Sequence, residues 1–451
     1  MNIPKKSTTP LISPYSKLGM KDLPFPSEPV VDPYSTDPRR NGAIYAVSPA
    51  SAQIEKFERL LVRPDDFPNR ARLAYLWSKG DQERGRGMGK TALLRYFQHR
   101  INVDWGGTEF SGNFSAAVVY VAFPSQVDRR YMEQLALSAL VDICKSGVLT
   151  ASRAALRFDK LTEEQIAAIT RNPDGTDSIE NILDSSILGA NNISSTSLDE
   201  EVEKQLQESG IQPAVARALA RGEFENYLRT FRKDGNLVPF YVPHDTKILE
   251  YSRTFLFNDL VLYFRAAGFA GAYLFIDDIE NLVDQMTRKH RIEFAKEFGL
   301  CTIRPGYANT THNFFSCVLT THQQASVGLS QAWADAGLSA IARLDPTSPN
   351  SVELPLPSED QAREIIVAHL DYYRVDTSEN GTAKPFTEDG INTLLKNRQN
   401  PRVLLSNAAT VLNYAVQEKV VAIDDDVVKA AMDTSALPTV PDFTDGIDSA
   451  L

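Results

Sequence analysis

Short apolar runs alternate with segments of helical periodicity along much of the chain. The runs at 73–77 (LAYLW) and 116–123 (AAVVYVAF) have the length of strands, and apolar residues at helical spacing follow them over 90–101 and 127–143. Further strand-like runs stand at 272–280 (AYLFIDDIE), 314–322 (FFSCVLTTH) and 352–357 (VELPLP). Buried parallel strands are apolar throughout, and strands that alternate with helices form parallel sheets. The pattern predicts an α/β fold with a central parallel sheet flanked by helices.

Three regions depart from this alternation. Residues 146–250 contain helical stretches around a polar, weakly patterned loop at 173–201, which predicts a large, mostly helical insertion. Every segment from 358 to 434 has helical spacing, and the first 46 residues are rich in proline and polar side chains. We therefore expect an extended N-terminal arm at 1–46, an α/β core at 47–345 with the insertion at about 146–250, an all-α lid at 346–434 and an acidic flexible tail at 435–451.

The composition is that of a folded protein, with 43% hydrophobic and 23% charged residues among 451. No apolar run approaches the roughly 20 residues of a membrane helix, and the N-terminus lacks the apolar core of a signal peptide. We therefore expect a cytoplasmic protein with no membrane contact. The cysteines Cys144, Cys301 and Cys317 are scattered, which predicts reduced thiols, and the six histidines form no metal-binding motif.

The net charge of −11 disfavours broad, non-specific binding to nucleic acid, which needs surplus lysine and arginine. Local basic strips at 70–72, 229–233 and 288–291 leave a restricted contact with DNA open. Solvated helix faces or loops are the commoner origin of such strips.

The most informative stretch is 80–97, GDQERGRGMGKTALLRYF, between a predicted strand and a predicted helix. Its glycines let backbone N–H groups approach an anion, and the helix N-terminus adds its dipole. Lys90 would reach the β- and γ-phosphates of a nucleotide, and the Thr91 hydroxyl would hold Mg²⁺. The pattern is GxxxxGK[ST], except that Arg84 replaces the first glycine, unless Gly85 takes its place by a shift of one residue. The predicted nucleotide contacts are Gly85, Gly87, Met88, Gly89, Lys90, Thr91 and Ala92.

A second motif, YLFIDD, places carboxylates after an apolar run. Asp277 would hold the magnesium shell through water, and Asp278 stands where the base that polarises the attacking water is normally a glutamate. Because the side chain of Asp278 is one methylene shorter, either hydrolysis is slow or Glu280 or a displaced water compensates. A buried strand that ends in a solvated acidic turn is the alternative, and the glycine loop weighs against it.

Polar residues at another strand end and two later arginines complete the candidate site. Thr320 or Thr321 would bond the γ-phosphate or the attacking water, with His322 nearby, although a helix cap explains these threonines equally well. Arg343 precedes the next strand, and Arg402 starts a C-terminal helix. Guanidinium groups neutralise phosphate charge bidentately, and ordinary surface arginines are the alternative.

Taken in order, these motifs resemble those of the AAA+ ATPase superfamily. GRGMGKT resembles its Walker A motif and LFIDD its Walker B motif. The resemblance implies ATP and Mg²⁺ as cofactors, Thr320 or Thr321 as sensor 1, Arg343 as an arginine finger that acts on the ATP of a neighbouring subunit, and Arg402 as sensor 2. It also implies a homo-oligomer, either ring or filament. The interval from Lys90 to Asp277 (277 − 90 = 187 positions) exceeds the usual spacing, and the predicted insertion accounts for it.

Within the superfamily, PFPSEPVVDPYSTDPRRNGAIY followed by SPASAQIEKFERLL resembles the entry segment of the ExeA/TniB/TnsC group. The ORC/Cdc6 initiators share the core but carry a winged helix after the lid, for which 17 residues (435–451) are too few. The resemblance thus implies an ATP-gated oligomeric switch in a DNA-linked process, of the transposition or bacterial anti-phage defence type.

A regulatory ATPase scaffold that recruits a protein effector without contacting DNA is the second hypothesis, and the acidic charge favours it. Its effector would bind at 150–250 or at the arm. A small-molecule phosphotransferase would share the glycine loop but would have no use for a helical lid that carries Arg402.

Overall fold

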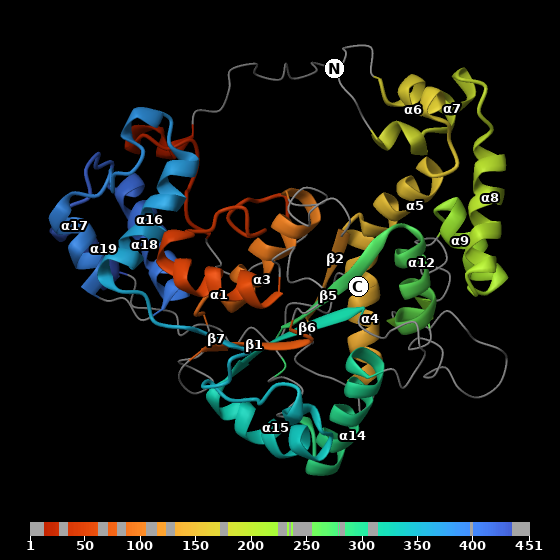
Figure 1. Ribbon diagram of the computed structural model, residues 1–451. Coiled ribbons are helices and arrows are strands. Elements are labelled where there is room, and N and C mark those ends of the chain that lie inside the picture. The colour runs from red at the N-terminus through yellow and green to blue at the C-terminus, as the bar shows by residue number, and fades with distance from the viewer. Residues whose placement is uncertain are drawn as a thin grey trace. The chain divides into compact units, whose positions relative to one another are not determined.

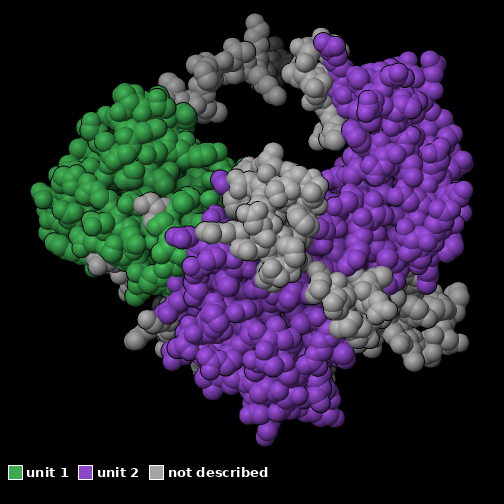
Figure 2. Space-filling view, in the orientation of Figure 1, with its two compact units in different colours: residues 1–54, 82–96, 354–447 green, residues 55–81, 97–353, 448–451 purple. Residues whose placement is uncertain are grey.

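The computed structural model describes residues 13–26, 35–61, 71–78, 87–104, 115–122, 131–171, 179–223, 232–233, 236–237, 255–277, 279, 285–304, 314–396 and 400–434. The chain divides into two compact units, each assembled from separate stretches of sequence (Figure 2). Unit 1 comprises residues 1–54, 82–96 and 354–447, and unit 2 comprises residues 55–81, 97–353 and 448–451. The domain boundaries expected from the sequence remain a prediction.

A five-stranded sheet in the order β2-β5-β6-β1-β7 forms the centre of unit 2 (Figure 1). Its strands are β1 (Leu73–Ser78), β2 (Ser115–Ala122), β5 (Phe269–Asp277), β6 (Phe315–His322) and β7 (Ser351–Leu354). The pairs β2/β5, β5/β6 and β6/β1 are parallel. Strands β1 and β6 are buried along their whole length, as their unbroken apolar runs predict.

Helices cover both faces of this sheet because alternate residues of a strand point to opposite sides. Leu274 and Ile276 of β5 share a core with α4 (Tyr131–Lys145), α12 (Leu260–Ala266), α14 (Arg288–Phe298) and α15 (Gln323–Asp335). On the other face, Phe275 meets the ring edge of Phe57 from α1 (Ser51–Leu61), and Phe57 stacks on Phe97 of α3 (Lys90–His99) at 4.3 Å. The predicted α/β fold with a central parallel sheet flanked by helices is confirmed.

The described part of the insertion is mostly helical, and it also contains the two-residue strands β3 (Arg232–Lys233) and β4 (Asn236–Leu237). It contains α5 (Val148–Phe158), α6 (Glu163–Thr170), η5 (Ile179–Leu183), α7 (Ser185–Ala190), α8 (Ser195–Glu208) and α9 (Pro213–Arg221). Residues 179–201, predicted to be loop, are mostly helical because Asp184 and Ser194 accept backbone N–H bonds as N-caps of α7 and α8. The Arg157 side chain is fully buried and bonds Asp199 at 2.7 Å, which ties α5 to α8.

Unit 1 joins the N-terminal arm to the C-terminal helices α16 (Glu359–Tyr373), α17 (Glu388–Lys396), α18 (Pro401–Gln417) and α19 (Asp425–Thr434). Leu18, Met20, Leu23 and Phe25 of the arm are at most 9% exposed and belong to the same apolar core as the four helices. The Lys21 amide donates to the Tyr373 carbonyl at 2.7 Å. The arm is therefore part of the core of this helical unit.

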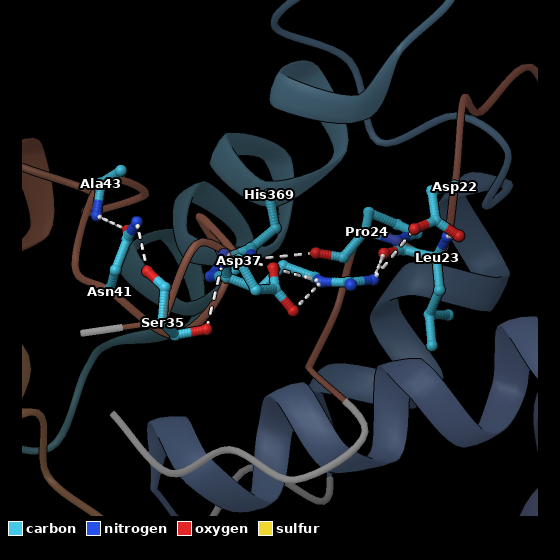
Figure 3. A network of polar contacts seen from close by, with 9 residues as sticks. Asp22, Leu23, Pro24, Ser35, Asp37, Asn41, Ala43 and His369 are labelled. Atoms are coloured by element: carbon cyan, nitrogen blue, oxygen red, sulfur yellow. Dashed lines mark hydrogen bonds and ion pairs between the residues drawn. The ribbon is translucent and has the colours of Figure 1, made fainter. Parts of the chain in front are cut away.

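Polar contacts join the arm to itself and to α16, among them the contact of His369 with Pro24 (Figure 3), and Arg39 supplies several others. Its guanidinium donates to the Leu23 carbonyl at 2.6 Å and to both carboxylate oxygens of Asp37 at 2.8 and 2.9 Å. It also lies over the Tyr373 ring, 5.4 Å from the centroid. Nearby, the Nδ1 of buried His369 donates to the Pro24 carbonyl at 3.1 Å, which fixes the neutral tautomer.

This histidine predicts an acid-sensitive helical unit. Burial, aided by the charge of Arg39, lowers the pKa of His369 from 6.5 to about 4. Between these values the unfolded chain binds the extra proton, so stability is complete above the unfolded pKa and falls by up to about 3 kcal/mol as the pH drops toward 4. Melting temperatures of the wild type and of His369→Gln between pH 7.5 and 5 should converge at low pH, since glutamine cannot titrate. If the melting temperatures of the two proteins changed in parallel with pH, the acid sensitivity would not come from His369.

Candidate functional site

The described part of the glycine loop has the conformation that an anion cradle needs. Gly87 and Gly89 have φ of 77° and 87°, in the left-handed region that glycine alone adopts without strain. Lys90 begins α3 and is 7% exposed, Met88 is buried, and Thr91 and Ala92 are half-buried in the first helical turn. Backbone amides at the start of a helix lack intrahelical partners, so this end can bind phosphate. Arg84 and Gly85 lie outside the described residues.

The start of α18 packs against this loop within unit 1. The Arg402 amide donates to the Gly87 carbonyl at 3.3 Å. A Cβ placed on Gly87 would lie 2.8 Å from both the Arg402 Cβ and the Asn400 Oδ1. Asn400 is the N-cap of α18, since its Oδ1 accepts from the Val403 amide at 3.0 Å. The structure thus brings Arg402 to the glycine loop and adds Asn400, which the sequence analysis missed although Asn-Pro is a typical helix start.

Replacing Gly87 with alanine should therefore lower the free energy of unfolding more than replacing Gly89 with alanine. Both changes place a side chain at positive φ, which costs about 1–2 kcal/mol. Only Gly87→Ala also forces Asn400 and Arg402 away, at about 1–3 kcal/mol more, because no described atom lies within 4 Å of a Cβ on Gly89. Urea unfolding of the two variants measures the difference. Equal losses would show that the contact with α18 contributes nothing.

The second part of the candidate site lies in unit 2, where β5 and β6 end side by side. The parallel register pairs Ile276 with Leu319, so Asp277 and Thr320 come next on neighbouring strands. Both are buried, and the Thr320 Oγ1 donates to the Asp277 Oδ1 at 2.5 Å. A short bond to an ionised carboxylate is a strong one, and it orients the carboxylate.

The two threonines of β6 have different roles. Thr320 is joined to Asp277, whereas the Thr321 hydroxyl donates to the His322 carbonyl at 3.3 Å and alternates to the other face of the strand. The two threonines therefore differ in their hydrogen-bond partners, and the assignment of either one to the γ-phosphate stays a prediction. Asp278 and Glu280 lie outside the described residues.

Arg343 is displayed at the surface of unit 2. Its side chain is 66% exposed, and its Nε lies 3.4 Å from the Asp345 carboxylate. The residues on either side, Ala342 and Leu344, are buried. The predicted site residues are thus divided: 87–92 and Arg402 belong to unit 1, whereas Asp277, Thr320, Thr321 and Arg343 belong to unit 2.

One predicted basic strip has a structural explanation. Arg72 donates from Nε to the Phe315 carbonyl at 2.6 Å and from its terminal nitrogen to the Thr302 carbonyl at 3.2 Å. Burial lowers its pKa, and its two hydrogen bonds commit the guanidinium to fixing the backbone. The strip at 288–291 starts α14, and of 229–233 only 232–233 is described.

The donors present suit Mg²⁺. Magnesium takes one or two protein oxygens and completes its shell with water and phosphate oxygens. The Thr91 hydroxyl in unit 1 and the Asp277 carboxylate in unit 2 are each oxygen donors of this kind. Among the described residues, no three His, Cys, Asp or Glu side chains gather as a metal cluster. None of the described helices has the length and apolarity of a membrane span.

The chain matches no protein-family model and no curated protein. Solved structures that resemble it include the Aeropyrum pernix ORC1 protein in complex with DNA, at 11% identity and a TM-score of 0.38, with 85% of this chain and 65% of that chain covered. The ADP form of the Aeropyrum pernix ORC2 protein follows at 11% and 0.42, with 89% and 70% covered, and its ADPNP-ADP complexes at 10% and 0.42, with 91% and 70% covered. This chain thus spans just under two thirds of the ORC1 chain, and the likeness is too remote to assign a family or an activity.

Proposed function

We propose that this chain is a Mg²⁺-dependent ATPase of the AAA+ type that acts as an ATP-gated oligomeric switch. The observation that carries the proposal is the bonded pair of Asp277 and Thr320 at the carboxyl ends of β5 and β6. Parallel strands end at one edge, and β1, which leads into the glycine loop, ends at that edge beside β6. Ligands of open parallel sheets bind at the carboxyl ends of the strands.

Each residue has a distinct task in this proposal. Backbone amides at 87–92 and the Lys90 ammonium bind the β- and γ-phosphates. Thr91 and Asp277 hold Mg²⁺, which neutralises charge on the phosphate oxygens when bound. Asp278, or Glu280 in its place, accepts the proton of the attacking water. Arg402 meets the γ-phosphate from the same subunit, and Arg343 meets it from the neighbour.

Thr320 is assigned the task of orienting Asp277, which predicts a change in magnesium dependence. Thr320→Val keeps the shape of the side chain but removes the hydroxyl that donates to the carboxylate. We expect the Mg²⁺ concentration that half-saturates nucleotide binding to rise about tenfold, because one hydrogen bond to a charged group contributes about 1.5–3 kcal/mol. Thr320→Ser should restore the wild-type value. A titration curve that is unchanged in Thr320→Val would exclude this task.

The setting we propose is a DNA-linked process in the cytoplasm, of the transposition or bacterial anti-phage defence type. Support comes from the resemblance of the arm to the ExeA/TniB/TnsC entry segment, and from the integration of that arm into the helical unit. A homo-oligomer, as ring or filament, follows from an arginine finger that acts between subunits.

A regulatory scaffold that recruits a protein effector is the second candidate. The net charge of −11 favours it, as does the internal use of Arg72, which removes one cation from a possible DNA surface. In this alternative the ATPase site is the same and only the partner differs.

Hydrolysis rates with and without duplex DNA at two salt concentrations distinguish the two candidates. A rate that DNA stimulates, and that falls steeply with salt, supports the DNA-linked switch because phosphate contacts are salt-sensitive. A rate that ignores DNA supports the scaffold. The absence of hydrolysis and of nucleotide binding under all conditions would overturn both.

A further inference from the structure

The backbone around Arg343 is fixed by the burial of its two neighbours in the sequence. Ala342 and Leu344 are buried in the core of unit 2, so the backbone cannot shift there without disrupting packing. Arg343 itself is 66% exposed, and Asp345 pairs with it at 3.4 Å. Arg343 is thus an exposed cation on a backbone segment that is held in place.

Two aromatic side chains of β1 hold this backbone segment through hydrogen bonds. The Tyr75 hydroxyl donates to the Ala342 carbonyl at 3.0 Å and accepts from the Trp333 Nε1 at 2.8 Å. Two residues along the strand, the Trp77 Nε1 donates to the Ser351 Oγ at 3.0 Å, and that hydroxyl donates to the Asp345 carbonyl at 2.6 Å. Tyr75 and Trp77 point to the same face, as period-two alternation requires. Arg343 therefore lies between two carbonyls that β1 fixes by hydrogen bonds.

Backbone bonds strengthen the same connection. The Tyr75 amide donates to the Asn350 carbonyl at 2.9 Å, and the Asn350 side chain donates to the Leu73 carbonyl at 2.9 Å. Tyr75, Trp77 and Trp333 are each at most 1% exposed. Buried polar groups without partners are costly, so these hydrogen bonds impose a single arrangement on the segment.

We propose that Tyr75 and Trp77 are positioning residues that aim Arg343 at the ATP of a neighbouring subunit. This inference rests on the proposed function, in which Arg343 acts between subunits. β1 is followed in the chain by the glycine loop, which in this proposal binds the subunit's own ATP. The same strand also holds Arg343, which acts on the ATP of the neighbouring subunit. The two sites of a ring or filament are thereby coupled through one strand.

The variant Tyr75→Phe tests the proposal because it removes only a hydroxyl. We expect turnover of the assembled protein to fall about tenfold or more, since small misplacements of a charge-stabilising group have large effects. The nucleotide Kd should stay within about twofold, because Tyr75 contacts no nucleotide in this proposal. Ser351→Ala, which removes the hydroxyl between Trp77 and Asp345, should behave in the same way and covers the case in which Tyr75→Phe folds poorly.

Mixing experiments separate positioning from a merely structural role. A Lys90→Ala subunit keeps its finger, so it should restore hydrolysis to Tyr75→Phe subunits, which keep their ATP site. Arg343→Ala subunits should not restore it. Tyr263→Phe is the matched control, since Tyr263 is as buried a residue as Tyr75 and its hydroxyl donates to the Leu149 carbonyl at 3.2 Å, remote in sequence from the Arg343 segment. The turnover of this variant should be unchanged.

Each outcome decides the question. Wild-type turnover in Tyr75→Phe and Ser351→Ala, beside an inactive Arg343→Ala, would overturn the positioning role and leave the proposed function intact. Failure of Lys90→Ala subunits to restore Tyr75→Phe, where they do restore Arg343→Ala, would place the defect in the subunit's own site. Wild-type turnover in Arg343→Ala would overturn the action between subunits and the positioning role with it.

Discussion

Replacing Lys90 with alanine is expected to raise the nucleotide Kd at least about 100-fold, which corresponds to about 3 kcal/mol. The lysine is 7% exposed and stands first in α3, directly after the left-handed Gly89. An ammonium in this place bonds phosphate oxygens as a charge-assisted donor, and methyl cannot replace it. Titration with a fluorescent ATP analogue measures the loss.

The matched control for this experiment is Lys289→Ala. Its side chain is 82% exposed and forms an ion pair with Glu293 at 3.7 Å on α14. The nucleotide Kd of this variant should equal that of the wild type. If Lys90→Ala also binds normally, the glycine loop is not a nucleotide site and the proposed function fails.

Arg343→Ala is expected to bind ATP with unchanged affinity and to hydrolyse it about 1,000-fold more slowly. An arginine that stabilises transferred phosphoryl charge contributes about this factor or more to turnover. The 66% exposure of the Arg343 side chain leaves its guanidinium accessible to another subunit. Steady-state turnover and equilibrium binding, measured on the same preparations, separate the two effects.

A mixture tests the trans arrangement directly. The Lys90→Ala subunit keeps Arg343 but cannot bind ATP, and the Arg343→Ala subunit binds ATP but lacks the arginine. Hydrolysis should therefore return when the two inactive variants are combined. No recovery, with assembly verified by sedimentation, would argue that Arg343 does not act between subunits.

The strands and the glycine loop were predictable because their signals are local. Strands buried on both faces leave uninterrupted apolar runs, and the runs at 73–77 and 314–322 correspond closely to β1 and β6. Asp277 and Thr320 were identified individually from their places at strand ends. Their hydrogen bond was not predicted, because it depends on which strands are neighbours and on their register.

The remaining features depend on contacts between distant parts of the chain. Nothing in the sequence near Asn400 indicates that its side chain would contact Gly87. Arg72 was grouped with surface cations because its acceptors, the carbonyls of Phe315 and Thr302, are more than 200 positions away in the sequence. The helices α7 and α8 were read as loop because single capping side chains are weak signals in a polar stretch. Long-range packing decides such cases.

The shared core of the arm and the C-terminal helices has a consequence for biosynthesis. Met20 and Phe25 emerge from the ribosome well before the helices that bury them, which begin at Glu359, more than 300 residues later. At about 5–20 residues per second, these apolar side chains stay without their partners for tens of seconds. The helical unit therefore completes its folding only after α16 to α19 have been synthesised, and chaperones that shield apolar segments should bind the nascent arm until then.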